Sequence, residues 1–293
     1  MMAESLVGKG REAIPMIIDP DSWVENLAGD TELDPEFGPG AVVGTAKING
    51  KIATILANDA QAINPRFPVV YFGVIGMEEA YKMALAVYAT MEADRGKPAK
   101  EKRPILLIVD TPGNGPGKVE EIFGMNKATG AYQLALAEAR KSGHPIVAMV
   151  IGRAISGAFL CHGLQADQIL ALPKKYGTMI HVMPLTSISR ITKLDVERLE
   201  VLAESNPVFA AGAEFFYRLG GVEELVESPE DMRQAIIRHI DEIYRKKIAG
   251  KEEELGPWGR GRLGELREGR RARGQVLRKM EEEFSQAASR YIG

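Results

Sequence analysis

Two glycine-rich loops contain the residues whose types and spacing could do chemistry. The first loop covers 111–118 and the second covers 152–157. Each follows an apolar run and precedes a helical pattern, so its backbone N–H groups would lie near the positive end of a helix dipole. Because glycine has no Cβ, a ligand could approach these N–H groups closely. The loops are therefore candidates for binding a negatively charged oxygen, and their glycines are Gly113, Gly115, Gly117, Gly152 and Gly157.

Neither common nucleotide-binding pattern fits the first loop. The Walker pattern requires Ser or Thr after Gly-Lys, but Gly117-Lys118 is followed by Val119. The dinucleotide fingerprint requires a third glycine at the position that Lys118 occupies. Purely structural turns remain an alternative for both loops.

A serine hydrolase is a second chemical hypothesis, with Ser156 as the nucleophile and His181 or His144 as the base. However, the Gly-x-Ser-x-Gly pattern is absent around Ser156, and no histidine has a spacing that places it beside this serine. A lone thiol on an apolar helix is more typical of a core residue than of a nucleophile. The residues interpreted as structural are Cys161, His144, His162 and His239.

Strand, loop and helix alternate around the two loops. Continuous apolar runs at 104–110 and 144–151 predict strands that are buried on both faces. Helical patterns follow at 119–141 and 158–165, and a short strand is expected at 168–173. This alternation predicts an α/β fold with right-handed β-α-β units and a mainly parallel core sheet. If the two long strands are neighbours, both loops form one site at the carboxyl edge of the sheet.

An antiparallel hairpin is expected ahead of the parallel units. Asn49-Gly50 suits a tight turn between strands at 41–48 and 51–58. A further strand at 68–76 and a helix at 77–94 are expected next. After Pro184 the pattern is mostly helical, with an amphipathic helix at 229–247.

The chain divides into three parts by its composition and hydrophobic pattern. Residues 1–40 predict an irregular arm without a core of its own, and 41–249 predict one domain with added helices. Residues 250–293 predict a basic tail, in which Gly256-Pro257 would interrupt any helix. This tail is either solvated or docked on an acidic partner.

Composition excludes several classes of function. The 293 residues include 37 basic and 40 acidic side chains, which gives a net charge of −3. This balance excludes a positive electrostatic field over the whole protein that would attract nucleic acid or a membrane. The single cysteine excludes an intramolecular disulfide framework and a zinc site built on several thiolates of this chain. The apolar runs are far shorter than the roughly 20 residues that span a bilayer, and the N-terminus lacks the apolar core of a signal peptide. We therefore expect a cytoplasmic protein.

The two loops also carry a family resemblance. Asp110-Thr111-Pro112-Gly113 looks like the Asp-Thr-Pro-Gly motif of carboxyltransferase α chains, and 150–158 looks like their Val-Ile-Gly-x-x-x-Ser-Gly-Gly motif. Together these stretches resemble the γ subunits of malonate decarboxylases, in the carboxyltransferase branch of the crotonase superfamily. The resemblance covers 41–245, leaves the arm and tail outside, and implies a crotonase-like fold.

The resemblance implies an activity and partners. Complexes of this family decarboxylate malonyl that is carried as a thioester on the phosphopantetheine-like arm of an acyl-carrier protein. The implied partners are a β subunit and the acyl-carrier protein subunit, with the active site between the γ and β chains and no cofactor or metal on this chain. Loss of CO2 leaves an enolate, which fixed N–H donors stabilise.

The resemblance also implies roles for particular residues. It places the N–H of Gly157, beside Ser156, in the oxyanion-donor position, with Gly113 or Asn114 on the facing loop. Leu160 stands where hydratases of the superfamily have a catalytic Glu, so water addition is not expected. The candidates for substrate binding are Gly115, Arg153 and His181. An alternative for Arg153 is a surface ion pair with Asp110. Asp110 itself is expected to cap the Thr111 turn through its side-chain oxygen.

Biotin use separates two alternatives. His181-Val182-Met183-Pro184 stands where biotin-dependent relatives often have Ser-Pro-Glu-Gly, which favours a biotin-independent enzyme. The alternatives are an α-type half of a biotin-dependent carboxyltransferase and a noncatalytic scaffold for the β subunit and carrier protein. In carboxyltransferases this half faces biotin, so Gly157 could stabilise the departing carboxylate instead of the enolate.

Overall fold

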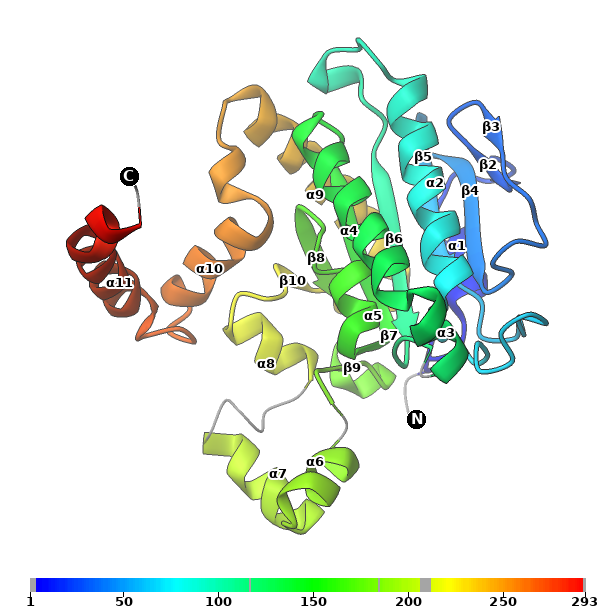
Figure 1. The fold of residues 1–293 in the computed structure, drawn as a ribbon. Coiled ribbons are helices and arrows are strands. Elements are labelled where there is room, and N and C mark those ends of the chain that lie inside the picture. Colours follow the sequence, from blue (N-terminus) through cyan, green and yellow to red (C-terminus); the bar gives the residue numbers. More distant parts are fainter. Residues whose placement is uncertain (1–3, 116, 184, 206–211, 292–293) are drawn as a thin grey trace.

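A mainly parallel sheet lies between two layers of helices (Figure 1). The computed structural model describes residues 4–115, 117–183, 185–205 and 212–291. The strands lie in the order β1-β4-β5-β6-β7-β8-β10, and β9 pairs with β7. Pairing is antiparallel from β1 to β5 and parallel from β5 onward, including β9. The bounds are β1 Val24–Glu25, β4 Ala41–Ile48, β5 Lys51–Asn58, β6 Ile105–Thr111, β7 Ile146–Ile155, β8 Gln168–Ala171, β9 Met179–His181 and β10 Glu224–Leu225.

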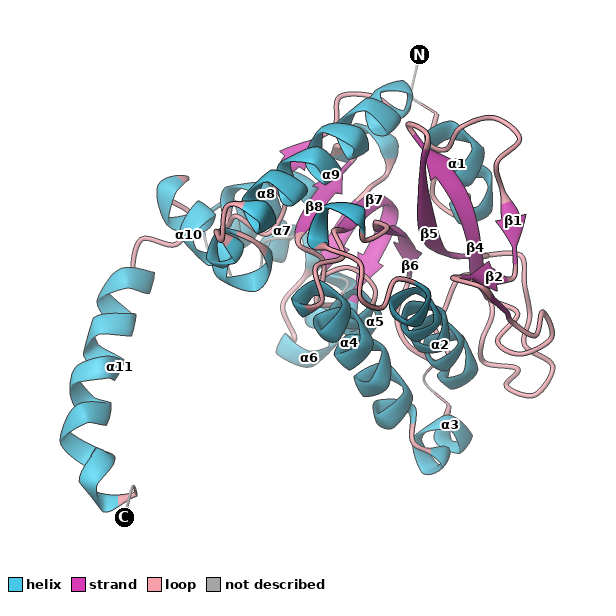
Figure 2. Cartoon of the chain, turned by 90° about the horizontal axis from the view of Figure 1, so that it is seen from above, coloured by secondary structure: helices cyan, strands magenta, loops and turns pink. Residues whose placement is uncertain are grey.

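Helices cover both faces of the sheet, as Figure 2 shows from above. One face carries α2 (Met77–Ala93), α4 (Met125–Lys141) and α5 (Ser156–Cys161), and the other carries α1 (Gly10–Ile17) and α9 (Met232–Ile248). Along β6, Ile105, Leu107 and Val109 belong to the first core, whereas Leu106 and Ile108 belong to the second. Because both faces are buried, the strand is a continuous apolar run instead of an alternating one.

The Asn49-Gly50 hairpin is confirmed. Strands β4 and β5 pair from Ala41↔Asn58 to Ile48↔Lys51, and both turn residues have positive φ, 50° and 75°. The carboxylate of Asp19, from the N-terminal arm, accepts the N–H groups of Asn49 at 3.0 Å and Gly50 at 2.7 Å.

Three predicted elements differ in the structure. Residues 68–76 form a loop with one bridge, Ile75↔Asn114, and not a strand. The helix expected at 119–141 is divided at Gly124, where φ is +105°, into α3 (Lys118–Phe123) and α4. Strand β7 continues to Ile155, so most of the second loop is strand and the chain turns sharply at Ser156.

The arm is less irregular than predicted. It contains α1, whose Ala13, Ile14 and Ile17 are buried in the second core. A short antiparallel pair, β2 (Leu27–Ala28) and β3 (Thr31–Glu32), follows. The arm is therefore part of the domain core.

The tail differs from the prediction as well. Pro257 lies in the first turn of α10 (Gly256–Leu266), where its missing N–H costs nothing, so Gly256-Pro257 begins a helix instead of interrupting one. Arg260 is buried and donates to the carbonyls of Ala166 at 2.8 Å and Leu164 at 2.6 Å. Helix α11 (Arg273–Ala287), none of whose residues is buried, projects from the body (Figure 2).

The predicted helical region after residue 184 is confirmed for the described part of the chain; Pro184 itself lies outside the described residues. It contains α6 (Leu185–Thr192), α7 (Val196–Ser205) and α8 (Ala213–Arg218), besides α9. In Figure 1, α6 and α7 lie below β9. No helix in the described ranges is long and apolar enough to cross a membrane.

Candidate functional site

The two glycine loops meet, as the sequence predicts for neighbouring strands. Strands β6 and β7 pair in parallel, and the loops leave their carboxyl ends together. A Cβ built on Gly157 would lie 2.3 Å from Oδ1 of Asn114, on the facing loop. The candidate site is therefore the space beside these two residues.

Ser156 makes the turn from strand to helix on the second loop. Its φ of +57° is unusual for a residue with a Cβ, and its side chain is exposed. Gly157 lies in the first turn of α5. The backbone N–H groups of a first helical turn have no hydrogen-bond acceptor within the helix.

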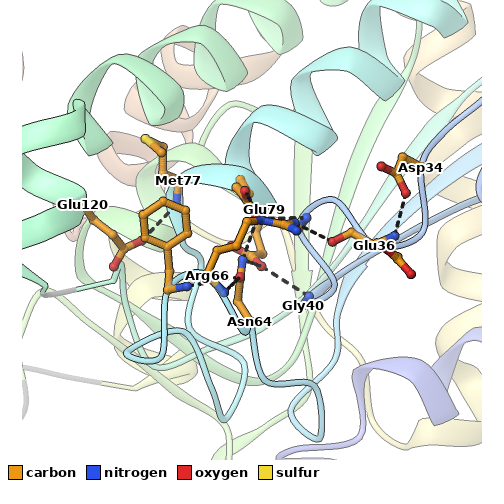
Figure 3. A network of polar contacts seen from close by, with 11 residues as sticks. Asp34, Glu36, Gly40, Asn64, Arg66, Met77, Glu79 and Glu120 are labelled. Carbon is orange, nitrogen blue, oxygen red and sulfur yellow. Dashed lines mark hydrogen bonds and ion pairs between the residues drawn. The ribbon is translucent and has the colours of Figure 1, made fainter.

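The first loop is wrapped around a buried carboxylate, Glu120. A Cβ built on Gly115 would lie 2.2 Å from Oε2 of Glu120, and one on Gly117 would lie 3.4 Å from it. The same carboxylate accepts the N–H of Met77 at 3.1 Å (Figure 3). Burial raises its pKa. Glycine at position 115 thus makes room for the Glu120 side chain, a role that the sequence pattern did not predict.

A sequence signal for this arrangement exists. Glu120 stands three residues after Gly117, which is the N-cap of α3, and this is the spacing of a capping box. The N–H of Gly115 is also used, since it donates to the carbonyl of Ile75 at 2.9 Å. Substrate binding by Gly115 stays a prediction that these internal contacts do not support.

The second loop is wrapped around another buried carboxylate, Asp110. A Cβ built on Gly152 would lie 2.3 Å from its Oδ1. The guanidinium of Arg153 donates to Asp110 through Nε at 3.0 Å and Nη2 at 2.7 Å. The alternative ion pair is therefore formed, but it is buried instead of on the surface, with side-chain exposures of 5% and 1%. Substrate binding by Arg153 stays a prediction that this pairing does not support.

Asp110 does not cap the Thr111 turn as expected. The hydroxyl of Thr111 itself accepts the N–H of Gly113 at 3.3 Å. The Asp110 carboxylate instead faces Arg153 because the neighbouring strand brings that residue opposite it, a contact that sequence spacing does not show.

The two remaining loop glycines differ in what lies around them. Among the described residues other than its chain neighbours, no atom lies within 4 Å of a Cβ built on Gly113, whose φ is +142°. The side chain of Asn114 fills the corresponding position at Gly157. The family motif predicts the oxyanion site at Gly157 with Gly113 or Asn114, so a ligand bound there would meet the Asn114 amide beside the Gly157 backbone.

His181 lies beside this site through strand pairing. It is the register partner of Ile155, the residue that precedes Ser156. Its ring is half-buried, which lowers its pKa, and neither ring nitrogen has a hydrogen-bond partner among the described residues. An imidazole whose two nitrogens are buried and have no partner among the described residues therefore lies next to the turn.

The structure does not support the serine hydrolase hypothesis. His181 forms no hydrogen bond to Ser156 within the described part of the chain. His144 is occupied at the opposite end of β6, where its Nδ1 meets the carbonyl of Arg103 at 2.9 Å, and burial lowers its pKa to about 4. Ser156 thus has the strained turn of a nucleophile but no base.

The remaining histidines and the cysteine are structural, as predicted. His162 is held between the hydroxyl of Tyr132 and the carbonyl of Ile108, each at 2.9 Å, and burial lowers its pKa to about 4. Burial raises the pKa of the Cys161 thiol to about 12. His239 contacts the side-chain oxygen of Gln168 at 2.7 Å. Among the described residues, no group of three or more His, Cys, Asp or Glu is arranged to hold a metal ion.

The rim of the site is apolar and exposed. The loop at 59–76 and helix α3 lie together here, with the rings of Phe67 and Phe123 6.5 Å apart. An exposed apolar surface of this kind is typical of a face that another molecule covers. Its exposed large side chains are Ile63, Tyr71, Phe72, Val119, Ile122 and Phe123.

Known proteins resemble this chain in sequence. The family model described as malonate decarboxylase gamma subunit matches residues 72–284. Malonyl-S-ACP:biotin-protein carboxyltransferase MADD of Malonomonas rubra is 68% identical over 282 residues, which are 96% of this chain and 97% of that protein. The carboxyl transferase subunit alpha of acetyl-coenzyme A carboxylase from Syntrophomonas wolfei is 25% identical over 235 residues, 76% of this chain and 67% of that protein.

A solved structure is similar as well. A chain in the crystal structure of a Pseudomonas malonate decarboxylase hetero-tetramer in complex with coenzyme A has a TM-score of 0.71 and 33% identity, covering 87% of this chain and 96% of that one. These matches confirm the predicted crotonase-like carboxyltransferase fold. They also reach beyond the predicted limits of 41–245, since the family model ends at residue 284. The chain belongs to the malonate decarboxylase γ-subunit family.

Proposed function

We propose that this chain is the γ half of a complex that, with a β subunit, removes the carboxyl group of malonyl-S-acyl-carrier protein. The observation that carries the proposal is that Gly157 meets Asn114, next to Gly113, at the ends of two paired strands. The name of the Malonomonas relative supports a malonyl thioester on a carrier protein as the substrate.

The proposed chemistry needs donors and no covalent step on the protein. The bond from the carboxyl carbon to the α carbon breaks, and its electron pair moves through the enolate to the thioester oxygen. The N–H of Gly157, with Gly113 or Asn114 opposite, stabilises this charge, and protonation at the α carbon gives the acetyl thioester. We further propose that His181 donates a hydrogen bond to the carboxyl group as it departs, which requires that the substrate reach a ring nitrogen that is buried in the free chain.

The identity of the carboxyl acceptor has two candidates. The relative at 68% identity is named for transfer to a biotin-protein, so we favour this acceptor, which the sequence motif had left as the alternative. Release as CO2 is the second candidate, favoured by the sequence at 181–184 and by the similarity to the Pseudomonas decarboxylase. In both cases the chain itself would hold no cofactor, because biotin would arrive on its own carrier protein in the first case and is not used in the second.

The β subunit is proposed to complete the site by covering the apolar rim. The matching Pseudomonas chain belongs to a hetero-tetramer, which supports a partner of this kind. We therefore expect the isolated chain to have negligible decarboxylase activity and to gain it on adding the β subunit. Robust turnover by the pure chain would contradict this expectation.

The test is a reconstitution with purified γ chain, β subunit and malonyl-loaded carrier protein. Acetyl thioester is measured with and without the biotin-protein, and with avidin added. Dependence on the biotin-protein and inhibition by avidin would support transfer, whereas full activity without biotin would support direct release. No acetyl thioester under any condition would refute the proposed function. Loop variants that assemble and turn over normally would favour the noncatalytic scaffold.

A further inference from the structure

We propose that Asp110 and Arg153 are positioning residues that hold the N–H of Gly157 in place. We propose also that the N-terminal arm contributes to this positioning. The kinetic part of this inference rests on the proposed function. The structural part concerns the placement of the second loop and stands on contacts within the chain.

The pairing of β6 and β7 is irregular at Asp110. Their register runs Val109↔Val150 and then Thr111↔Ala154, so the three β7 residues at 151–153 lie opposite Asp110 alone. Such a bulge interrupts the ladder and leaves backbone groups without their usual partners. The Asp110 Oδ1 takes the N–H of Arg153 at 2.7 Å and so replaces the missing strand contact.

The Asp110 carboxylate is held by donors from two directions. The backbone and guanidinium of Arg153 supply three N–H groups, and the N–H of Gly8, in the arm, donates to Oδ2 at 2.8 Å. The ring of Phe72 lies 4.3 Å from the guanidinium carbon and covers it. Because charge-assisted bonds in a buried site are strong, the carboxylate has little freedom to move.

The arm reaches this pair through a tight turn. Gly8 has a φ of +80° and precedes α1, whose Ile14 and Ile17 are anchored in the core. A Cβ built on Gly152 would lie 3.1 Å from the Cα of Val7, so the arm also packs directly on the second loop. Arm, first motif and second loop thus meet at one carboxylate.

Few residues separate the Asp110–Arg153 pair from the N–H of Gly157. Ala154 and Ile155 are the only residues between Arg153 and the Ser156 turn, and both belong to β7. A displacement of the Arg153 backbone would therefore pass along the strand to the N–H of Gly157. A misplacement of about 1 Å in a catalytic group can lower the rate about 100-fold.

The chain offers a matched control at the other end of β6. Asp94 accepts the backbone N–H of Arg103 at 2.7 Å and its Nε at 3.0 Å, and Asp94 is equally buried. The pattern repeats that of Asp110 and Arg153, but Arg103 precedes the strand whose far end carries the site. A purely structural role of both pairs would lower Tm in each variant without lowering kcat per assembled complex in one variant alone.

The experiment compares Asp110→Asn with Asp94→Asn in the assembled complex. Both variants are expected to lower Tm. Asp110→Asn is expected to lower kcat per assembled complex about 100-fold with KM within about twofold, whereas Asp94→Asn changes kcat less than about threefold. Equal kcat losses, or a loss in Asp110→Asn that appears in KM, would overturn the proposal.

A second readout does not depend on activity. Amide hydrogen exchange in the peptide 150–160 is expected to rise in Asp110→Asn and to stay at the wild-type rate in Asp94→Asn. If wild type shows no malonyl-thioester activity but this exchange difference appears, the proposed function fails and the positioning role stands. Unchanged exchange in Asp110→Asn refutes the positioning role.

Conservative variants keep the comparison available if Asp110→Asn does not assemble. Arg153→Lys and Arg103→Lys retain the charge and the backbone N–H but lose the contact through two guanidinium nitrogens. Arg153→Lys is expected to lower kcat with KM unchanged and to raise exchange at 150–160, and Arg103→Lys to do neither. A rise in KM in Arg153→Lys would instead assign Arg153 to substrate binding and overturn the proposal.

Discussion

Gly157 and Asn114 face each other so closely that a Cβ on Gly157 would lie 2.3 Å from Oδ1 of Asn114. The loops at the ends of β6 and β7 therefore form one surface, and the Asn114 amide occupies the space beside the proposed donor. A substitution at Gly157 must displace this amide before it can affect a ligand.

The first prediction concerns this contact. Gly157→Val should lower kcat for malonyl-thioester decarboxylation about 100- to 1,000-fold, because loss of one oxyanion donor costs about 2.7–4 kcal/mol. Ser156→Ala should be much milder, since a backbone donor does not need the hydroxyl. Steady-state kinetics on purified complexes with the β subunit would measure both.

The order of these two effects is the decisive result. A nucleophilic serine would give the opposite order, with turnover abolished in Ser156→Ala. Near-normal turnover in Gly157→Val would remove the second loop from the chemistry. Assembly must be shown first, because the Gly157 substitution could also disturb the start of α5.

The second prediction concerns Gly115. Gly115→Ala places a methyl group 2.2 Å from the Glu120 carboxylate, so it should lower the free energy of unfolding by about 1–3 kcal/mol. Combining it with Glu120→Ala should cost less than the sum of the two single changes, since the clash is then absent. Urea unfolding of the four proteins measures this coupling. A raised KM without loss of stability would show that Gly115 contacts substrate.

The third prediction concerns the buried part of the tail. Arg260→Met leaves two carbonyls and the nearby Glu223 without their cation, so it should lower the free energy of unfolding by roughly 3 kcal/mol. The matched change Arg278→Met lies on the exposed helix α11 and should have little effect. Equal Tm values for both variants would show that α10 does not stabilise the domain.

The fourth prediction concerns docking of an acidic carrier protein on the exposed part of the tail. Arg270 and Arg273 contact the Leu219 carbonyl and Glu265. The test therefore uses the exposed Arg271, Arg278 and Lys279, of which Arg271 and Lys279 form exposed ion pairs with Glu268 and Glu283. Reversing all three to Glu should weaken carrier association at low salt and have less effect at high salt. Titration at two ionic strengths measures this, and unchanged Kd at low salt would leave the tail without this role.

The fifth prediction concerns acid stability. Burial lowers the pKa of His162 to about 4, below its unfolded value near 6.5, so the unfolded chain binds the proton first as pH falls. The stability contributed by neutral His162 is therefore present above pH 6.5 and is lost as pH falls toward 4, by about 3 kcal/mol in total. Removing the group in His162→Gln should flatten the pH dependence of unfolding between these limits. An unchanged slope would show that His162 does not control it.

The sequence by itself determined the family and the two buried strands and hairpin that position the site. The unbroken apolar runs of β6 and β7 predicted strands buried on both faces, and Asn49-Gly50 predicted the hairpin, because burial and turn geometry depend on nearby residues. The Asp-Thr-Pro-Gly and Ser-Gly motifs placed Gly113, Ser156 and Gly157 at the ends of those strands. Local patterns also predicted that His144, His162 and Cys161 would be core residues.

Only the tertiary structure decided what surrounds each glycine. The first loop folds around Glu120 and the second around Asp110, so Gly115 and Gly152 make room for carboxylates of the chain itself. Sequence spacing cannot show this, because Asp110 meets Arg153 across a bulge in the sheet and Gly8 from an arm about a hundred residues away. Contacts between segments distant in sequence arise from strand order and register, and these are fixed when the whole core packs.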